Sequence, residues 1–393
     1  MGLKQNTWKL NQWYDQDVAG NVSYSAPVNL WGAGKNSSGA LGLNYSAPGA
    51  VSNISSPVQI PGTNWKIGSN IDPSMSGNDG WMGLKTDGTL WGWGLNDFGQ
   101  LGNNPGYSPQ PSGKWSSPVQ VPGTDWKSVN YHYKGNGGIK TDGTLWMWGN
   151  NEWGILGQNQ HDVHRSSPTQ VPGTTWDTCG NNMASQSIAR KTDGTLWVWG
   201  SNSYGSLGQN STVAYSSPVQ IPGTTWGRSI SNNSANVAAI KTDGTLWAWG
   251  KGVRGANGQN NQIQYSSPVQ VGSDTTWEKV VVGLKGWLAI KTDGTLWGIG
   301  SDYYGELGQN TSGTYISSPI QIPGTNWSST HMDAYSGVAT KTDGTAWGWG
   351  ENSYVGSLGL GDAVDRSSPS QIPGTSWNMA YTNGTTSLYL TQQ

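Results

Sequence analysis

Aspartate is the residue that this sequence places most regularly for chemistry. Lys-Thr-Asp-Gly-Thr occurs six times and puts one carboxylate in each copy, at Asp87, Asp142, Asp193, Asp243, Asp293 and Asp343. Pairs of carboxylates can act as general acid and base, as in glycoside hydrolysis. An Asp-Gly pair is also a strong signal for a tight β-hairpin, because glycine accepts the positive φ that the turn requires. We therefore predict that these aspartates form turns, and that the lysine before each turn is a solvated charge at the end of a strand.

The other residues of catalytic type are few and scattered. His161 and His164 are zinc-ligand types, but a zinc site needs three or four converging donors, and no third is near in the sequence. Asp362 and Asp365 lie in the corresponding segment of the last repeat, without the dense oxygen donors of a calcium loop. Cys179 is the only cysteine, which excludes an intrachain disulfide. We predict no catalytic site, no metal and no cofactor.

A repeat of about fifty residues positions these groups. Copies of Lys-Thr-Asp-Gly-Thr begin 50 to 55 residues apart, and Ser-Ser-Pro begins seven times. One repeat contains four segments of strand character: residues 217–221, the residues after Trp226, residues 237–240 and, beyond the Asp-Gly turn, residues 246–249. Four short strands per repeat are typical of one blade of a β-propeller.

Each end of the chain carries part of a repeat. Residues 30–42 match residues 90–102, the second half of a repeat, whereas the residues after Trp377 match the first half. Aligned on the earlier repeat, Gln392 corresponds to Lys241. We predict that residues 29–34 pair with residues 386–391 in one blade, because this pairing would remove an open sheet edge. The predicted fold is all-β, a seven-bladed β-propeller over residues 29–393 closed by strands from both ends, with residues 1–28 as an N-terminal extension.

The tryptophans of the Leu-Trp positions have two interpretations. They could form a ring that stacks on carbohydrate, or they could pack between blades. Because every repeat carries one, we favour packing. These residues are Trp31, Trp91, Trp146, Trp197, Trp247, Trp297 and Trp347.

Composition excludes several classes of function. The net charge is −2 and no cluster of cations stands out, which argues against nucleic acid, because phosphate binding needs clustered cations. No run of about 18 apolar residues predicts a membrane-spanning helix, and the N-terminus lacks the apolar stretch of a signal peptide. Only 11% of the residues are charged. A surface rich in Asn, Ser, Thr and Gly favours an exterior setting such as a virion or a cell surface.

The repeat resembles that of the regulator of chromosome condensation family. The resemblance lies in Trp-x-Trp-Gly-x-Asn-x-x-Gly-Gln-Leu-Gly followed by Ser-Pro-x-Gln, and it extends over residues 29–393. The Lys-Thr-Asp-Gly-Thr-Leu-Trp form is similar to the bacterial and viral branch, and residues 8–15 resemble proteins predicted in marine phages. The resemblance implies a seven-bladed disc that binds proteins through a loop-bearing face. Members of the family have diverse roles, so the fold alone does not imply one function.

Candidate partner-binding residues lie where the chain departs from the repeat. We expect the N-terminal extension to dock on the disc or on another subunit, because exposed aromatic surface marks interaction sites; the alternative is a disordered leader. The loop of residues 103–115 is longer than its counterparts, and tyrosines precede Ser-Ser or Ile-Ser-Ser in the equivalent loops. The candidates are Trp8, Trp13, Tyr14, Tyr107, Trp115, Tyr215, Tyr265 and Tyr315.

The hypothesis that these observations favour is a non-enzymatic phage virion protein, either a capsid or tail decoration or a host-binding fibre tip. Its partners would be other virion subunits or a host-surface receptor, and its location the exterior of the particle. One alternative is a bacterial secreted or surface protein-binding module, an inhibitor or an adhesin. Another is a glycan-binding lectin. Neither nucleic acid nor membrane insertion is expected.

Overall fold

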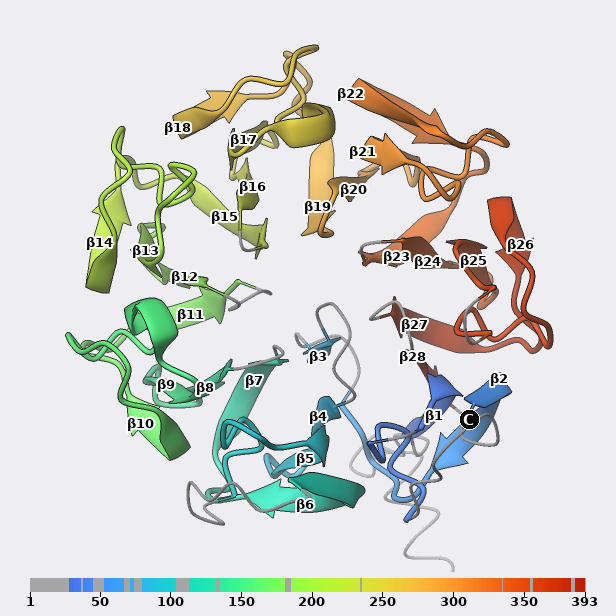
Figure 1. Ribbon diagram of the computed structural model, residues 1–393, viewed down its shortest axis with the longest axis horizontal. Helices are drawn as coiled ribbons and strands as arrows, with labels where there is room; N and C mark the ends of the chain where they lie inside the picture. Colours follow the sequence, from blue (N-terminus) through green and yellow to red (C-terminus); the bar gives the residue numbers. More distant parts are fainter. Residues whose placement is uncertain are drawn as a thin grey trace, which may run out of the picture.

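The computed structural model describes residues 28–36, 38–44, 53–66, 71–73, 80–103, 113–131, 135–180, 185–233, 235–333, 335–353, 356–382 and 386–392. These residues form a ring of β-sheets around a central axis (Figure 1). Two short 3-10 helices, η2 (Glu152–Gly154) and η3 (Val253–Gly255), interrupt the strands. The prediction of an all-β propeller is confirmed. The N-terminal extension, with Trp8, Trp13 and Tyr14, and the candidate residue Tyr107 lie outside the described residues.

The described strands are grouped into seven sheets. One sheet has the order β27 (Trp377–Thr382), β28 (Thr386–Gln392), β1 (Val28–Lys35), β2 (Asn53–Ile60), and we call it the closing sheet. The next contains β4 (Gly80–Leu84), β5 (Leu90–Leu95) and β6 (Lys114–Val121). It is followed by β7 (Trp126–Tyr131), β8 (Gly135–Lys140), β9 (Leu145–Gly149) and β10 (Arg165–Gln170), with β3 (Ile71–Pro73) added beside β7.

The remaining four sheets each contain four consecutive strands. They are β11 (Trp176–Cys179), β12 (Gln186–Lys191), β13 (Leu196–Gly200) and β14 (Tyr215–Ile221); β15 (Trp226–Asn232), β16 (Asn236–Lys241), β17 (Leu246–Gly250) and β18 (Tyr265–Gln270); β19 (Trp277–Val282), β20 (Gly286–Lys291), β21 (Leu296–Asp302) and β22 (Thr314–Ile322); and β23 (Trp327–Met332), β24 (Ser336–Lys341), β25 (Ala346–Gly350) and β26 (Arg366–Gln371). We number the strands of each sheet from the centre of the ring outward as first to fourth (Figure 1).

Six of the sheets have the four antiparallel strands of a complete blade, and the β4–β6 sheet has three. In the β4–β6 sheet, the position of the first strand is marked by Trp65, which forms a bridge with Lys85, and by Lys66, whose N–H donates to the carbonyl of Leu84. A little further on, β3 pairs parallel to β7 of the next sheet, an arrangement that the repeat does not predict. The prediction of seven complete four-stranded blades therefore holds for six sheets within the described residues.

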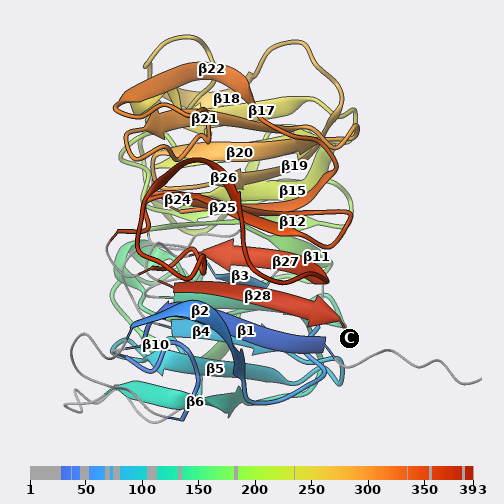
Figure 2. The same cartoon turned by 90° about the vertical axis from the view of Figure 1, so that its right-hand side faces the viewer.

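The two ends of the chain pair with each other. β1 runs antiparallel to β28 from Val28 opposite Gln392 to Gly34 opposite Thr386, so the predicted pairing of residues 29–34 with residues 386–391 is confirmed. Figure 2 shows β28 lying between β27 and β1. The predicted alignment is wrong by one residue, because Trp377 opposes Thr391 where other first-strand tryptophans oppose a lysine. Thr391, not Gln392, therefore takes the lysine position.

One kind of hydrogen bond recurs between each sheet and the sheet before it in the ring. The donor is an indole Nε1 or a tyrosine hydroxyl in the second or third strand, and the acceptor is a backbone carbonyl between the third and fourth strands of the neighbour. The seven pairs are Trp93–Ala40, Trp148–Gln100, Trp199–Ile155, Trp249–Ser206, Trp287–Ala256, Trp349–Glu306 and Tyr389–Leu358, at 2.7 to 3.0 Å. The last pair joins the closing sheet to the β23–β26 sheet, so these contacts continue across both ends of the chain.

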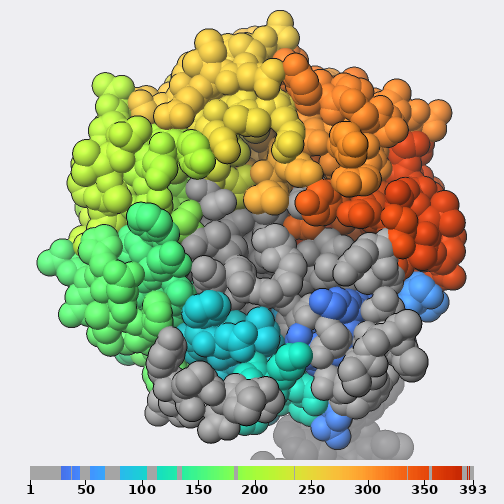
Figure 3. Space-filling model, in the orientation of Figure 1, coloured from blue at the N-terminus to red at the C-terminus, as the bar shows by residue number. Residues whose placement is uncertain are grey.

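Glycine allows a second contact between neighbouring sheets. In each loop after a third strand, one glycine has φ between +68° and +84° and lies against the first serine of a Ser-Ser pair in the next sheet. A Cβ at this glycine would approach that serine within 2.3 to 2.9 Å, closer than folded chains permit. The pairs are Gly39–Ser116, Gly99–Ser166, Gly154–Ser216, Gly205–Ser266, Gly255–Ser317, Gly305–Ser367 and Gly356–Ser55. In Figure 3 the surface accordingly passes round the disc in chain order, and blue meets red.

The Asp-Gly segments are turns, as predicted. Asp243 Oδ1 accepts hydrogen bonds from the N–H and the hydroxyl of Thr245, and that hydroxyl accepts one from Trp247 Nε1. The same chain of bonds recurs after Asp87, Asp142, Asp193, Asp293 and Asp343. The bonds from threonine lower the pKa of each aspartate. These carboxylates are therefore ionised turn residues that orient the tryptophan of the next strand.

Candidate binding surfaces

Antiparallel order divides the connections between the two faces of the disc. Connections from first to second and from third to fourth strands lie at one end of the sheets, which we call the loop face. The Asp-Gly turns and the connections between successive sheets lie at the other end, the turn face. No helix among the described residues has the length and apolar character needed to cross a membrane.

Buried polar side chains fix the longer loops of the loop face. Asn202 is buried after β13, and its Oδ1 accepts the N–H of Leu207 at 2.9 Å while its Nδ2 donates to two further carbonyls. Asn36, Asn96, Asn151 and Asn352 make the same bond to a leucine N–H. Asp302 takes this place in the β19–β22 sheet, and burial raises the pKa of its carboxyl. Hydrogen bonds within the protein therefore fix the conformation of these loops.

Large aromatic side chains project from these fixed loops. Trp153 is 48% exposed, Tyr204 37% and Tyr303 61%, and they lie on the loops after three of the third strands. Trp153 and Tyr204 occupy the same position, directly before the glycine that touches the next sheet. Aromatic residues on rigid supports are the commonest energetic centres of protein interfaces.

A cluster of tyrosines and charged groups adjoins these aromatics. Lys285 Nζ lies 4.0 Å from the ring centre of Tyr335 and 5.9 Å from that of Tyr304, and the two rings meet edge to face at 5.4 Å. Burial, followed by the charge of Arg254, lowers the pKa of Lys285. Burial also raises the pKa of Glu306, whose carboxylate accepts the N–H of Tyr304 at 2.6 Å. The loop face thus combines cation–π contacts with shielded charges beside exposed rings.

The residues considered for catalysis or metal binding serve the loops instead. His164 Nδ1 accepts the N–H of Asn151, and Asp365 Oδ1 accepts the N–H of Asn352 at the equivalent place in another sheet. Burial raises the pKa of the Cys179 thiol to about 12, so the reactive thiolate is suppressed. Across the part of the chain that the structure describes, no three His, Cys, Asp or Glu side chains are grouped to hold a metal ion.

The remaining candidate aromatics lie in outer strands and not in loops, which corrects the prediction. Tyr215 and Tyr265 begin β14 and β18, oppose Gly200 and Gly250, and are half-buried against the core. Trp115 holds the same position in β6, opposite Gly94, and is 38% exposed. Tyr315 lies one residue earlier in β22, because Ile316 opposes the equivalent glycine, and it is 52% exposed. Trp153, Tyr204 and Tyr303 were not predicted from the sequence, although Trp153 and Tyr204 directly precede a repeated glycine.

On the turn face, each lysine before an Asp-Gly turn lies in a cage of two tryptophan rings and is partly exposed, a contact that the prediction of a solvated charge did not include. Lys241 Nζ lies 3.7 Å from the ring centre of Trp247 and 5.1 Å from that of Trp226. The other five lysines lie 4.1 to 5.3 Å from the corresponding two rings of their own sheets. The Leu-Trp tryptophans therefore pack on the first tryptophan of their own sheet, and the buried contact between sheets comes mostly from the tryptophan two residues later.

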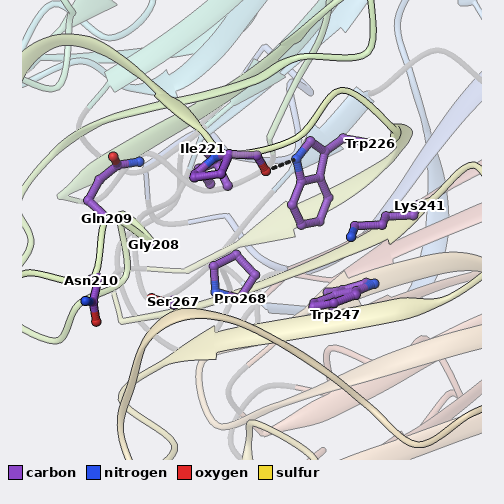
Figure 4. Close-up of a pocket in the computed structure, with 10 residues that line it drawn as sticks. Gly208, Gln209, Asn210, Ile221, Trp226, Lys241, Trp247, Ser267 and Pro268 are labelled. Atoms are coloured by element: carbon purple, nitrogen blue, oxygen red, sulfur yellow. Dashed lines mark hydrogen bonds between the residues drawn. The ribbon is translucent and has the colours of Figure 1, made fainter.

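A pocket of about 310 Å³ opens at the cage of Lys241 (Figure 4). Trp226, Trp247 and Pro268 line it, and Gln209 and Asn210 of the preceding sheet reach its far side. Gln209 Nε2 donates to the carbonyls of Leu207 and Gln220, so its amide is fixed. The ammonium group of Lys241 thus lies at one end of a pocket whose sides are aromatic and apolar.

Nearer the central axis, one buried carboxylate joins three sheets. Asp177 in β11 accepts hydrogen bonds from Arg228 at 2.9 Å and from Arg190 at 2.5 Å, and Lys127 lies 3.6 Å away. Burial raises the pKa of Asp177, but the bond and charge of Arg228, with Arg190 and Lys127, lower it overall. Because all three cations lie close to the carboxylate of Asp177, the main role of these four side chains is to hold the three sheets together.

Comparison with known proteins agrees with this geometry. Residues 87–131, 142–182 and 193–231 match the family model described as the regulator of chromosome condensation (RCC1) repeat. The fold is similar to that of Prp20p from Saccharomyces cerevisiae, whose crystal structure was reported with its binding to Gsp1p and histones (TM-score 0.79, 18% identity, 94% of this chain and 92% of that chain). It is also similar to yeast RCC1 (Prp20) in a complex with Kap60 (0.77, 17%, 93% and 89%) and to human WBSCR16 (0.75, 19%, 93% and 100%). Three segments of the chain therefore match the regulator of chromosome condensation repeat, and the chain folds as a propeller similar to these solved structures.

Proposed function

We propose that this protein is a non-enzymatic binding disc that recognises a protein partner through its loop face. The observation that carries the proposal is the set of exposed aromatic side chains, Trp153, Tyr204 and Tyr303, on loops fixed by buried hydrogen bonds. Because these loops are already ordered, binding costs little conformational entropy. Similar solved propellers are described with protein partners, Kap60 in one case and Gsp1p and histones in another, which supports a partner of this class.

The finer proposal is that the disc is displayed on a phage particle as a ring of seven blades, the β4–β6 sheet being the blade with three described strands. Its partners would be other virion subunits or a host-surface receptor, and residues 1–28 would attach it. The support is the polar composition, with 11% charged residues, and the resemblance of residues 8–15 to phage proteins. Mass spectrometry of purified particles tests this location. Repeated absence from particles, with recovery from culture medium or the bacterial surface, would favour the secreted or surface module.

Substitution of the aromatic residues tests the loop face. The triple variant Trp153→Ser, Tyr204→Ser, Tyr303→Ser should fold but lose at least about tenfold in particle incorporation or in adsorption of particles to host cells. The matched control is Thr124→Ser, Thr224→Ser, Thr325→Ser, three exposed threonines of the turn face. If both readouts stay unchanged in the aromatic variant, the loop face is not the binding surface.

A further inference from the structure

One lysine cage of the turn face already holds a carboxylate. Lys291 Nζ lies 4.7 Å from the ring centre of Trp277 and 4.1 Å from that of Trp297, and Asp274 Oδ2 lies 2.6 Å from the same Nζ. Asp274 comes from the connection before β19, which reads Gly-Ser-Asp where the other repeats have Pro-Gly-Thr. The protein therefore shows, in its own sequence, which group binds such a cage.

The other five cages consist of the same lysine and two tryptophan rings but have no such carboxylate. Within the described residues, no acidic oxygen lies within 4.0 Å of Nζ in the cages of Lys85, Lys140, Lys191, Lys241 and Lys341, whereas Lys291 forms its pair with Asp274. Their nearest acidic group along the chain is the turn aspartate two residues later, and threonine already occupies its Oδ1. The turn aspartate therefore offsets part of the positive charge of the lysine without pairing with it, and the lysine Nζ can still bind an external group.

The connection before each of these cages favours an external ligand. Its glycine has positive φ and lies so close to the cage that a Cβ would come within 3.7 Å of Nζ at Gly123 and Gly173, and within 3.3 Å at Gly324. In the β19–β22 sheet the residue three before the first-strand tryptophan is Asp274 in place of this glycine, and its carboxylate reaches Lys291. Where the Pro-Gly-Thr connection is present, the loop itself supplies no side chain to the ammonium group.

We propose that these cages bind the carboxylates of uronic acid units in an acidic polysaccharide. The pocket at Lys241 has a volume of about 310 Å³, larger than a carboxylate needs and sufficient for one sugar ring. Its ammonium group can make a charge-assisted bond to the carboxylate, while Trp226, Trp247 and Pro268 offer apolar surface to the C–H face of the ring. Because the cage recurs from sheet to sheet, a polymer with one carboxylate per unit can engage several cages at once. The Lys241 cage lies toward the turn face, although Gln209 and Asn210 from a third-to-fourth connection line its far side. Trp153, Tyr204 and Tyr303 do not line this pocket, so the proposal does not depend on them.

Calorimetry with monomeric galacturonate and with polygalacturonate tests the proposal. Wild-type protein should bind galacturonate at five equivalent sites, and the triple variant Lys191→Gln, Lys241→Gln, Lys341→Gln should bind polygalacturonate at least about tenfold more weakly. Lys279→Gln is the control, because Lys279 is an exposed turn-face cation outside the cages and donates to the carbonyl of Ser328. Thermal unfolding of each variant checks that the disc remains folded.

A gain of binding gives a second readout that loss of folding cannot imitate. Asp274→Asn keeps an oxygen for the bonds from Thr276 but removes the charge beside Lys291. It should raise the number of galacturonate sites from five to six. Equal binding of neutral dextran, an unchanged number of sites in Asp274→Asn, or binding of polyglutamate in preference to polygalacturonate would overturn the proposal, the last in favour of an acidic peptide.

Discussion

Removal of one oxygen atom from Tyr389 tests how the ring is closed. Tyr389 lies in β28, is fully buried and donates its hydroxyl to the carbonyl of Leu358 at 2.9 Å. This bond joins the closing sheet, which contains both ends of the chain, to the β23–β26 sheet. Tyr389→Phe keeps the ring and its packing against Trp377, at 5.4 Å between ring centres, and deletes only the bond.

The expected cost follows from burial of the acceptor. A buried carbonyl left without its donor costs about 1–3 kcal/mol, more than the net value of an exposed hydrogen bond. We therefore expect Tyr389→Phe to lower the free energy of unfolding in guanidinium by about 1–3 kcal/mol. Tyr204→Phe, at a residue 37% exposed on the loop face, is the matched control and should change it by less than about 0.5 kcal/mol. Equal stabilities of the two variants would refute the argument that this hydroxyl links the two sheets.

Three further predictions concern other contacts of the described residues. Gly205→Ala should lower the unfolding midpoint clearly more than Gly313→Ala, because both have positive φ but only the Cβ at position 205 would meet Ser266, at 2.5 Å; parallel denaturant titrations compare them, and equal losses would contradict the contact. Asp177→Asn should destabilise more than Lys127→Gln, because Asp177 serves three cations whereas the Lys127 side chain is 46% exposed; the reverse order in thermal unfolding would refute this. The bonds from Lys291 and Thr276 lower the pKa of Asp274 from 3.8 to about 2. The ionised carboxylate therefore stabilises the fold above about pH 3.8, and this stabilisation is lost as the pH falls toward 2. The difference in unfolding free energy between wild type and Asp274→Asn should shrink over that range, and a constant difference would contradict the prediction.

Local sequence signals predicted the parts of the fold that depend on neighbouring residues. The Asp-Gly pairs fixed the hairpins because only a few residue types suit such turns, and each turn also orients a tryptophan through threonine. The pairing of β1 with β28 followed from the half repeats at each end. The alignment was wrong by one residue because the distance from the first-strand tryptophan to the lysine is not constant: it is 15 residues after Trp226 but 14 after Trp277.

Contacts between sheets were harder to predict, because they join residues that the repeat separates by most of its length. The lysines looked solvated, since their position at a strand end says nothing about two rings from other strands of the sheet. The contact of Gly205 with Ser266 likewise needs the coordinates, although the sequence shows a glycine in each of these loops and a Ser-Ser pair in each repeat. Exposed loop aromatics such as Trp153 were not predicted, because the exposure of a loop side chain depends on how the loop packs against the next sheet.

Removal of β28 tests the closed ring most directly. Truncation after residue 385 deletes the partner of both β1 and β27, and hydrogen exchange then reports on every sheet separately. We expect protection to fall in β1 and β27 at once, and the midpoint of thermal unfolding of the whole disc to drop. Unchanged protection in β1 and an unchanged midpoint would show that the two ends of the chain do not hold the ring together.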